Sequence, residues 1–179
     1  MESTDIGRRQ RLSGLFLILG GVLYLVFFAG RFVGLEIGDD LWYLNLTLHG
    51  ILLGLLVGGL AIAAFTSEKG RTGLLVGATL GFLGLSIGHP LWSAAMVVVA
   101  VTIYQLGLRL PATLLGLGGL GWLWIFLAGV RIGDENGREL TGSEPAVALI
   151  SVVAMGVGLI LFGIEQTRVS HPSDRSVKV

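Results

Sequence analysis

Charged side chains in this chain are confined to short clusters, and apolar spans of 16–23 residues lie between the clusters. An α-helix needs about 17–25 apolar residues to cross a hydrocarbon layer about 30 Å thick. Only 13% of the 179 residues are charged, whereas a soluble domain carries about 25%. The chain is therefore predicted to be a multi-pass protein of the cell membrane.

Six transmembrane helices are predicted. Pro111 and Pro145 suit helix starts, because the first helical residues have no intrahelical partner for their N–H groups. Two residues, His89 and Pro90, separate the third span from the fourth, so these two spans must form a tight antiparallel hairpin. The spans are Leu12–Gly30, Tyr43–Phe65, Gly73–Gly88, Leu91–Gly107, Pro111–Val130 and Ala146–Gly163.

The predicted fold is all-α, with a single six-helix transmembrane domain at residues 12–164. A cytoplasmic N-terminal tail at 1–11 and a polar cytoplasmic tail at 165–179 flank it. We interpret the first span as a spanning helix rather than a cleaved signal peptide, because its 19 residues exceed the 7–15 of a signal-peptide core.

The cations predict the orientation. Cytoplasmic segments of a membrane protein carry an excess of Lys and Arg. With the N-terminus inside, only Arg31, Arg131 and Arg138 of the 12 cations fall in outer loops. Both termini are therefore expected in the cytoplasm, together with nine cations: Arg8, Arg9, Arg11, Lys69, Arg71, Arg109, Arg168, Arg175 and Lys178.

An Ile-Gly pair recurs at the outer end of each outward-running span, at 37–38, 87–88 and 132–133. The recurrence favours three tandem antiparallel helical hairpins. It also arises without any repeat, because glycine ends helices in the left-handed conformation and Trp prefers the membrane interface. On this second interpretation Gly88 ends its helix and Trp92 lies at headgroup level.

Glycines spaced four residues apart mark one face of the second span and one face of the third. Glycines at this spacing share a helix face and let another backbone approach closely. We expect these two helices to pack within the chain through these faces, with homodimerisation through one of them as the alternative. The glycines are Gly50, Gly54, Gly58, Gly73, Gly77 and Gly81.

No Asp, Glu, Lys or Arg lies in the middle two-thirds of any span. Proton pumps, ion-coupled transporters and voltage sensors usually carry such groups at depth. The sequence therefore disfavours transport driven by carboxylates, but it leaves transport of a neutral or apolar solute open.

His49 is the one ionisable group clearly inside a span, about 9 Å along the helix from Tyr43. One interpretation is a histidine satisfied by Asn45, by a backbone carbonyl or by Tyr24. The alternative is a ligand of haem or of a transition metal, with His89 on a neighbouring helix as its partner. Asn45, His49 and His89 are thus the candidate ligand or cofactor residues.

Four acidic residues follow the outer ends of the first and fifth spans: Asp39, Asp40, Asp134 and Glu135. They could form a mouth that attracts cations. Solvated outer loops would carry the same residues, so both interpretations stay open.

Aromatic residues near the span ends are expected to contact lipid. Trp122, Trp124 and Phe126 give the fifth span a bulky outer half, suited to lipid contact or to a flat apolar ligand. Tyr104 and Gln105 end the fourth span and are expected to anchor it at the cytoplasmic interface.

Known catalytic and cofactor motifs were sought without success. The chain has no Cys, which excludes disulfides, thiolate metal sites and cysteine nucleophiles. It contains no H-E-x-x-H, G-x-S-x-G or P-loop sequence, and no long basic run that would bind nucleic acid. No catalytic residue or metal site is predicted.

Three function classes stay open. The leading one is a small transporter or channel-like protein without deep carboxylates. The second is a non-catalytic accessory or scaffold subunit, with partners in a homo-oligomer or a larger membrane complex within the lipid bilayer. The third is a haem or metal redox protein. A hydrated passage lined by Asn45, Thr47, His49 and Ser93 would favour transport, and a dry bundle with an exposed glycine face would favour the accessory role.

Overall fold

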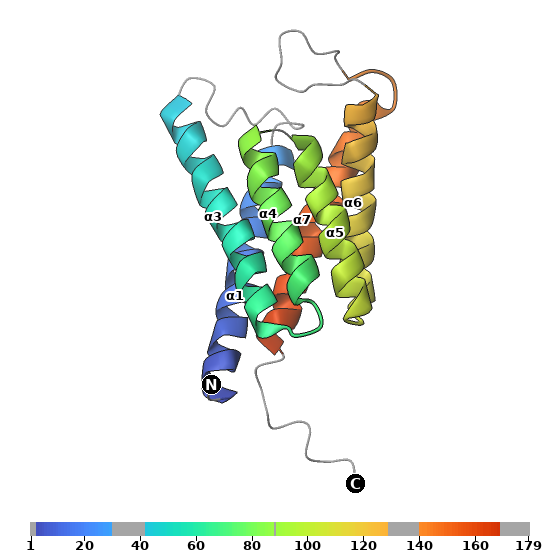
Figure 1. Cartoon of the computed structure of the whole chain (residues 1–179). Helices are drawn as coiled ribbons and strands as arrows, with labels where there is room; N and C mark the ends of the chain where they lie inside the picture. The colour runs from blue at the N-terminus through green and yellow to red at the C-terminus, as the bar shows by residue number, and fades with distance from the viewer. Residues whose placement is uncertain (1–2, 30–41, 88, 129–139, 169–179) are drawn as a thin grey trace.

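The computed structural model describes residues 3–29, 42–87, 89–128 and 140–168, and this part of the chain is helical without strands (Figure 1). Each predicted span coincides over most of its length with one helix, and the predicted all-α, membrane-like class is confirmed. The helices are α1 (Ser3–Tyr24), the π-helix η1 (Leu25–Ala29) that continues it, α3 (Trp42–Thr66), α4 (Arg71–Ile87), α5 (His89–Gln105), α6 (Arg109–Leu127) and α7 (Glu144–Arg168).

Four segments of the described chain are long and apolar enough to cross a membrane: Asp5–Phe28, Thr47–Thr66, Arg109–Leu127 and Glu144–Arg168. Helices α4 and α5 have 17 residues each. At a rise of 1.5 Å per residue they are about 25 Å long.

Two helices extend beyond their predicted spans into the segments expected to be polar tails. Helix α1 begins at Ser3, where an ion pair of 3.1 Å joins Asp5 to Arg9 one turn later. Helix α7 continues to Arg168, whose guanidinium lies 2.9 Å from the Glu165 carboxylate. Charged pairs at these spacings support helical turns outside an apolar span.

The six α-helices form a closed ring in the order α1, α3, α4, α5, α6, α7. Each helix packs along its neighbours in the chain, and α1 packs along α7 to close the ring. Figure 1 shows the helices running side by side along one common axis, with both described chain ends near the same end of the bundle.

Helices α1 and α7 approach each other most closely at two pairs of glycines. A Cβ on Gly163 would lie 2.6 Å from the carbonyl oxygen of Gly14, and a Cβ on Gly14 would collide with the carbonyl of Gly163. Seven residues along, a Cβ on Gly21 would lie 3.0 Å from the carbonyl oxygen of Gly156. Only glycine permits this backbone contact.

Glycines also bring backbones together at other interfaces of the ring. A Cβ on Gly118 of α6 would lie 2.6 Å from the carbonyl oxygen of Ser151 in α7. Gly84 of α4 lies against the backbone of Trp92 in α5. Glycine residues thus determine how closely several neighbouring helices pack.

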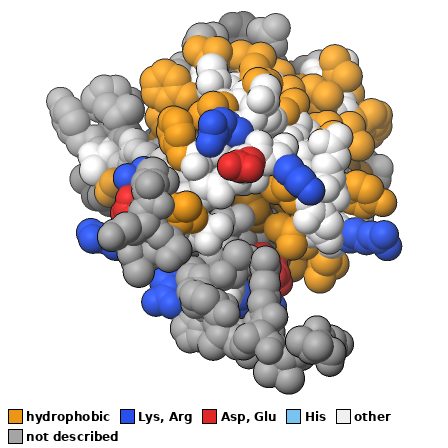
Figure 2. Space-filling view, turned by 60° about the horizontal axis from the view of Figure 1, so that its bottom comes forward, with side chains coloured by type: hydrophobic (Ala, Val, Ile, Leu, Met, Phe, Trp, Pro, Cys, Tyr) orange, Lys and Arg blue, Asp and Glu red, His pale blue; other side chains and the backbone are white. Residues whose placement is uncertain are grey.

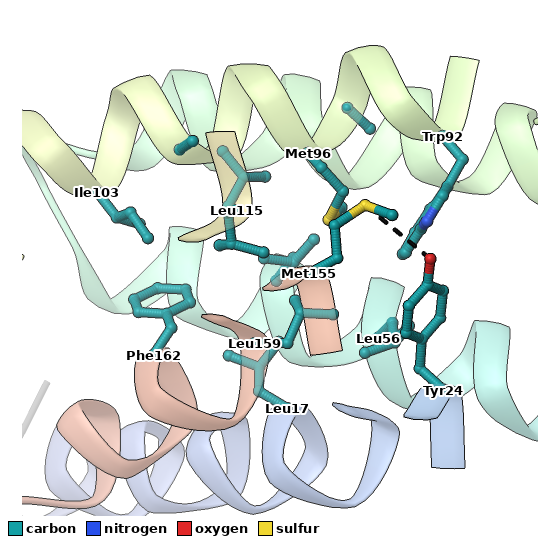
Figure 3. Close-up of a cluster of buried hydrophobic side chains, with 14 of the residues drawn as sticks. Leu17, Tyr24, Leu56, Trp92, Met96, Ile103, Leu115, Met155, Leu159 and Phe162 are labelled. Carbon is teal, nitrogen blue, oxygen red and sulfur yellow. Dashed lines mark hydrogen bonds between the residues drawn. The ribbon is translucent and has the colours of Figure 1, made fainter. Parts of the chain in front are cut away.

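The ring interior is filled by apolar side chains from all six helices. In Figure 3, Leu115, Met155 and Leu159 lie near the centre of this core, with Phe162 on one side of them and Leu56 on the other. The buried polar side chains of the described residues are hydroxyls: Ser13, Ser93, Thr102 and Ser151.

Backbone carbonyls accept hydrogen bonds from the buried hydroxyls. Ser13 Oγ donates across the α1–α3 interface to the carbonyl of Gly59 at 2.8 Å. Within their own helices, Thr102 donates to Val98 and Ser151 to Val147, at 2.8 and 2.7 Å. Such bonds satisfy a hydroxyl in an apolar interior without water.

The outer surface of the bundle also carries large apolar side chains. Leu117, Leu127 and Ile150 are 63%, 79% and 67% exposed. Soluble monomers rarely expose apolar patches of this extent, and their presence on several helices indicates a lipid-facing surface.

One end of the bundle is rich in cations. This end carries the start of α1, the α3–α4 turn, the α5–α6 turn and the end of α7, and Figure 2 shows basic side chains across it. The acidic residues described there are Asp5, Glu68 and Glu165, against seven cations: Arg8, Arg9, Arg11, Lys69, Arg71, Arg109 and Arg168.

The glycine contact between α1 and α7 predicts a difference between two Gly→Ala variants. Gly163→Ala should lower stability by about 1–3 kcal/mol, because its methyl group forces two backbones apart. Gly54→Ala should leave stability unchanged or raise it by up to about 1 kcal/mol, because alanine favours helix and no described atom lies within 4 Å of the new methyl group. Thermal unfolding in detergent measures both, and equal stability of the two variants would contradict the packing described here.

Candidate functional site

A cluster of aromatic and polar side chains lies inside the bundle toward the end opposite the basic one. At its centre is Tyr24, which is 1% exposed at the end of α1. Its hydroxyl donates to Met155 Sδ of α7 at 3.9 Å (Figure 3). The indole N–H groups of Trp122 and Trp92 approach the same hydroxyl oxygen. Four helices thus meet at one buried hydroxyl.

Trp92, which the sequence predicts to lie at headgroup level, has its side chain in the bundle interior. It is 2% exposed, and its ring centroid lies 6.0 Å from that of Tyr24. Gly81 and Gly84 of α4 leave the space that the residue fills. Its indole nitrogen is buried, and no described group accepts a hydrogen bond from it, although the Tyr24 hydroxyl lies nearby.

Trp122 also differs from the expectation of lipid contact, since it is only 6% exposed. It shares a face of α6 with Leu115, Gly118 and Ile125, which are buried at three- and four-residue intervals. That spacing is the periodicity of a core-facing helix stripe, and it could have identified Trp122 as an interior residue. Trp124 is 51% exposed on the perimeter, as expected for lipid contact.

The π-helix η1 adjoins this cluster. In η1 the rings of Phe27 and Phe28 both lie beside His49 of α3, with centroid distances of 4.4 and 6.2 Å and edge-to-face geometry. Short π-helical turns are rare and are frequent at functional sites. The half-buried imidazole of His49 is therefore held among aromatic rings where α1 meets α3.

The structure tests the cofactor prediction only in part. The side chains of Asn45 and His89 lie outside the described part of the chain, as do the acidic residues Asp39, Asp40, Asp134 and Glu135. Among the described residues, no group of three His, Cys, Asp or Glu side chains is placed to hold a metal ion. Haem or metal binding through His49 and His89 stays a prediction.

The glycines of α4 face α5 rather than α3. The Cβ positions of Gly73, Gly77 and Gly81 meet the side chains of Thr102, Val99 and Trp92, respectively. These glycines of α4 therefore pack within the chain, with α5 as their neighbour. The reason is that the ring places this side of α4 along α5.

The glycines of α3 differ among themselves. A Cβ on Gly58 would lie 3.5 Å from the Phe16 ring of α1. A Cβ on Gly50 or on Gly54 would have no described atom within 4 Å. Leu52 and Leu56, each two residues further along, face the core with at most 1% exposure. Two residues correspond to about 200° around a helix, so Gly50 and Gly54 lie on the outer side of α3.

Comparison of the chain with protein-family models, with curated proteins and with solved structures gives no match. No activity or ligand is therefore transferred from a relative. The functional inference rests on the geometry of the bundle itself.

The Tyr24 network predicts that one buried hydroxyl stabilises the bundle. Tyr24→Phe removes the hydroxyl that donates to Met155 Sδ, so it should lower stability by about 0.5–1.5 kcal/mol, the net contribution of one hydrogen bond. Tyr104→Phe is the matched control, because that side chain is 55% exposed and surface changes usually stay within about 0.5 kcal/mol. Thermal unfolding followed by tryptophan fluorescence compares them, and an undiminished stability of Tyr24→Phe would contradict the role given to this network.

Proposed function

We propose that this chain is a non-catalytic subunit of a cell-membrane complex, and that it binds a transmembrane helix of another subunit on the outer side of α3. The observation that carries the proposal is the pair Gly50 and Gly54, which lie one helical turn apart and face no other part of the described bundle.

In this proposal all six helices cross the bilayer as three antiparallel hairpins, with both termini in the cytoplasm. The cation-rich end supports this orientation, because cytoplasmic ends of membrane proteins carry the excess of Lys and Arg. A C-terminal reporter found on the outer side of the membrane would contradict it.

The contrast with the other helices supports a role in helix association. Every described glycine of α6 and α7 has another atom of the bundle within 4 Å of its Cβ position. The same is true of four glycines of α4: Gly73, Gly77, Gly81 and Gly84. Lipid provides no hydrophobic drive for helix association, so close van der Waals contact at small residues is the main attraction. Gly50 and Gly54 offer such contact without using it within the described part of the chain. Ile51 beside them is 50% exposed and would add apolar area.

The apolar interior favours the accessory role over the transporter role. Three of the four residues expected to line a passage have described side chains, and they differ in burial. Ser93 is buried in the core, His49 is half-buried and Thr47 is exposed. The buried hydroxyls of Ser13, Thr102 and Ser151 donate to backbone carbonyls, and that of Tyr24 donates to Met155 Sδ. Transport of a neutral solute and a redox role of His49 and His89 stay predictions.

The test is capture of a complex of defined composition from gently solubilised native membranes. Wild type should co-purify with a second subunit in a fixed ratio by native mass spectrometry. Gly54→Leu should abolish the complex, because its side chain holds the partner backbone away. Thr79→Leu should retain it, since this control adds similar bulk at an exposed position of α4.

Three results would overturn the proposal. One is a wild-type chain that remains monomeric in every mild detergent. Another is a complex that survives Gly54→Leu. The third is a complex whose mass corresponds to two copies of this chain, which would assign the α3 face to self-association.

A further inference from the structure

A groove lies on the outer surface of the bundle between α5 and α6, in the half that ends at the basic side. Its volume is about 510 Å³. It exists because small residues meet where the two helices pack: Ala100 on α5, and Ala112 and Gly116 on α6. Ala100 and Ala112 are at most 5% exposed and form its floor, and a Cβ on Gly116 would lie 3.6 Å from the Ala100 methyl group.

The groove is apolar along its length and polar at one end only. Val97, Val101 and Leu120 line the part nearer the middle of the bundle. Tyr104, Gln105 and Thr113 line the part nearest the α5–α6 turn. From Val97 to Gln105 is about 12 Å along α5, close to the roughly 15 Å thickness of one hydrocarbon leaflet.

The polar end of the groove has a surplus of positive charge. Arg109 is exposed at the first residue of α6 and forms no ion pair with any described residue. The α3–α4 turn is adjacent, since a Cβ on Gly70 would lie 2.9 Å from Leu106 Cδ1. That turn adds Lys69 and Arg71 against a single acid, Glu68.

We propose that this groove binds one anionic glycerophospholipid of the leaflet at the basic end. One acyl chain lies along Ala100 and Gly116, and the phosphate contacts the Arg109 guanidinium, with the Tyr104 hydroxyl and the Gln105 amide as further donors. The lipid matches the groove in two respects. Its acyl chain is apolar, like the length of the groove, and its anionic headgroup complements the cationic end of the groove. A partner helix would use the apolar length but would not require a cation at one end.

The lipid proposal rests on the membrane placement of the bundle, and it is independent of the partner helix proposed for the outer side of α3.

The experiment uses purified full-length protein in detergent, titrated with phosphatidylglycerol or with phosphatidylcholine of the same acyl chains. Native mass spectrometry counts the bound lipids. We expect one phosphatidylglycerol to bind more tightly than any phosphatidylcholine.

Two variants test the two ends of the groove. Arg109→Gln should weaken phosphatidylglycerol binding about fivefold, as expected for one basic group near an anionic headgroup. Gly116→Leu should fill the groove and abolish the binding of both lipids at this site. Arg8→Gln and Thr79→Leu are the controls, because both change exposed positions outside the groove, and both should bind lipid as wild type does.

Thermal unfolding establishes that each variant is folded. If Gly116→Leu unfolds, Val101→Phe provides a second filling variant, because Val101 is 55% exposed at the groove wall. Equal binding of the two lipids, wild-type affinity in Arg109→Gln, or retained binding in a folded filling variant would each overturn the proposal. So would a co-purified protein subunit whose cross-links map to this groove.

Discussion

The backbone contact between α1 and α7 is the interaction on which the rest of the structure depends. These helices are the first and last of the chain, and their packing converts a row of hairpins into a closed ring. Gly14 opposite Gly163 and Gly21 opposite Gly156 let the two backbones approach along two helical turns. In lipid, where apolar burial gives little net attraction between helices, this contact area is a principal source of stability.

A ring closed this tightly has consequences for function. Its interior is filled by leucine, methionine and aromatic side chains, and the described polar groups within it are hydroxyls and indole or phenol groups. Two features of the outer surface remain for recognition, the open glycine pair on α3 and the groove between α5 and α6. Both lie on the outer side of the bundle, so the partners proposed for them are a helix and a phospholipid. The Tyr24 cluster lies inside the bundle, toward the end opposite the basic one, and joins four helices.

Hydropathy predicted the helices well because crossing a bilayer requires long uncharged spans, and each predicted span coincides over most of its length with a described helix. It could not predict which helix faces which. Gly50 and Gly54 have the spacing of a packing motif and contact nothing described, whereas Gly14 and Gly163 bring two backbones together from 149 residues apart. The burial of Trp92 depends on space left by two glycines on another helix, which a local sequence pattern does not reveal. The seven-residue spacing of Gly14 with Gly21, and of Gly156 with Gly163, was the signal in the sequence that pointed to the α1–α7 contact.

The measurement that tests the dry, closed ring most directly is thiol labelling of interior positions by a membrane-impermeant reagent. Because the chain has no Cys, single cysteines at Leu56, Met96 or Leu159 report on the core without background. All three residues are fully buried. The structure predicts no labelling from either side of the membrane, with Lys69→Cys as the reactive control at the basic end. Labelling of the interior cysteines in intact membranes would reveal a hydrated passage and would contradict this account of the bundle.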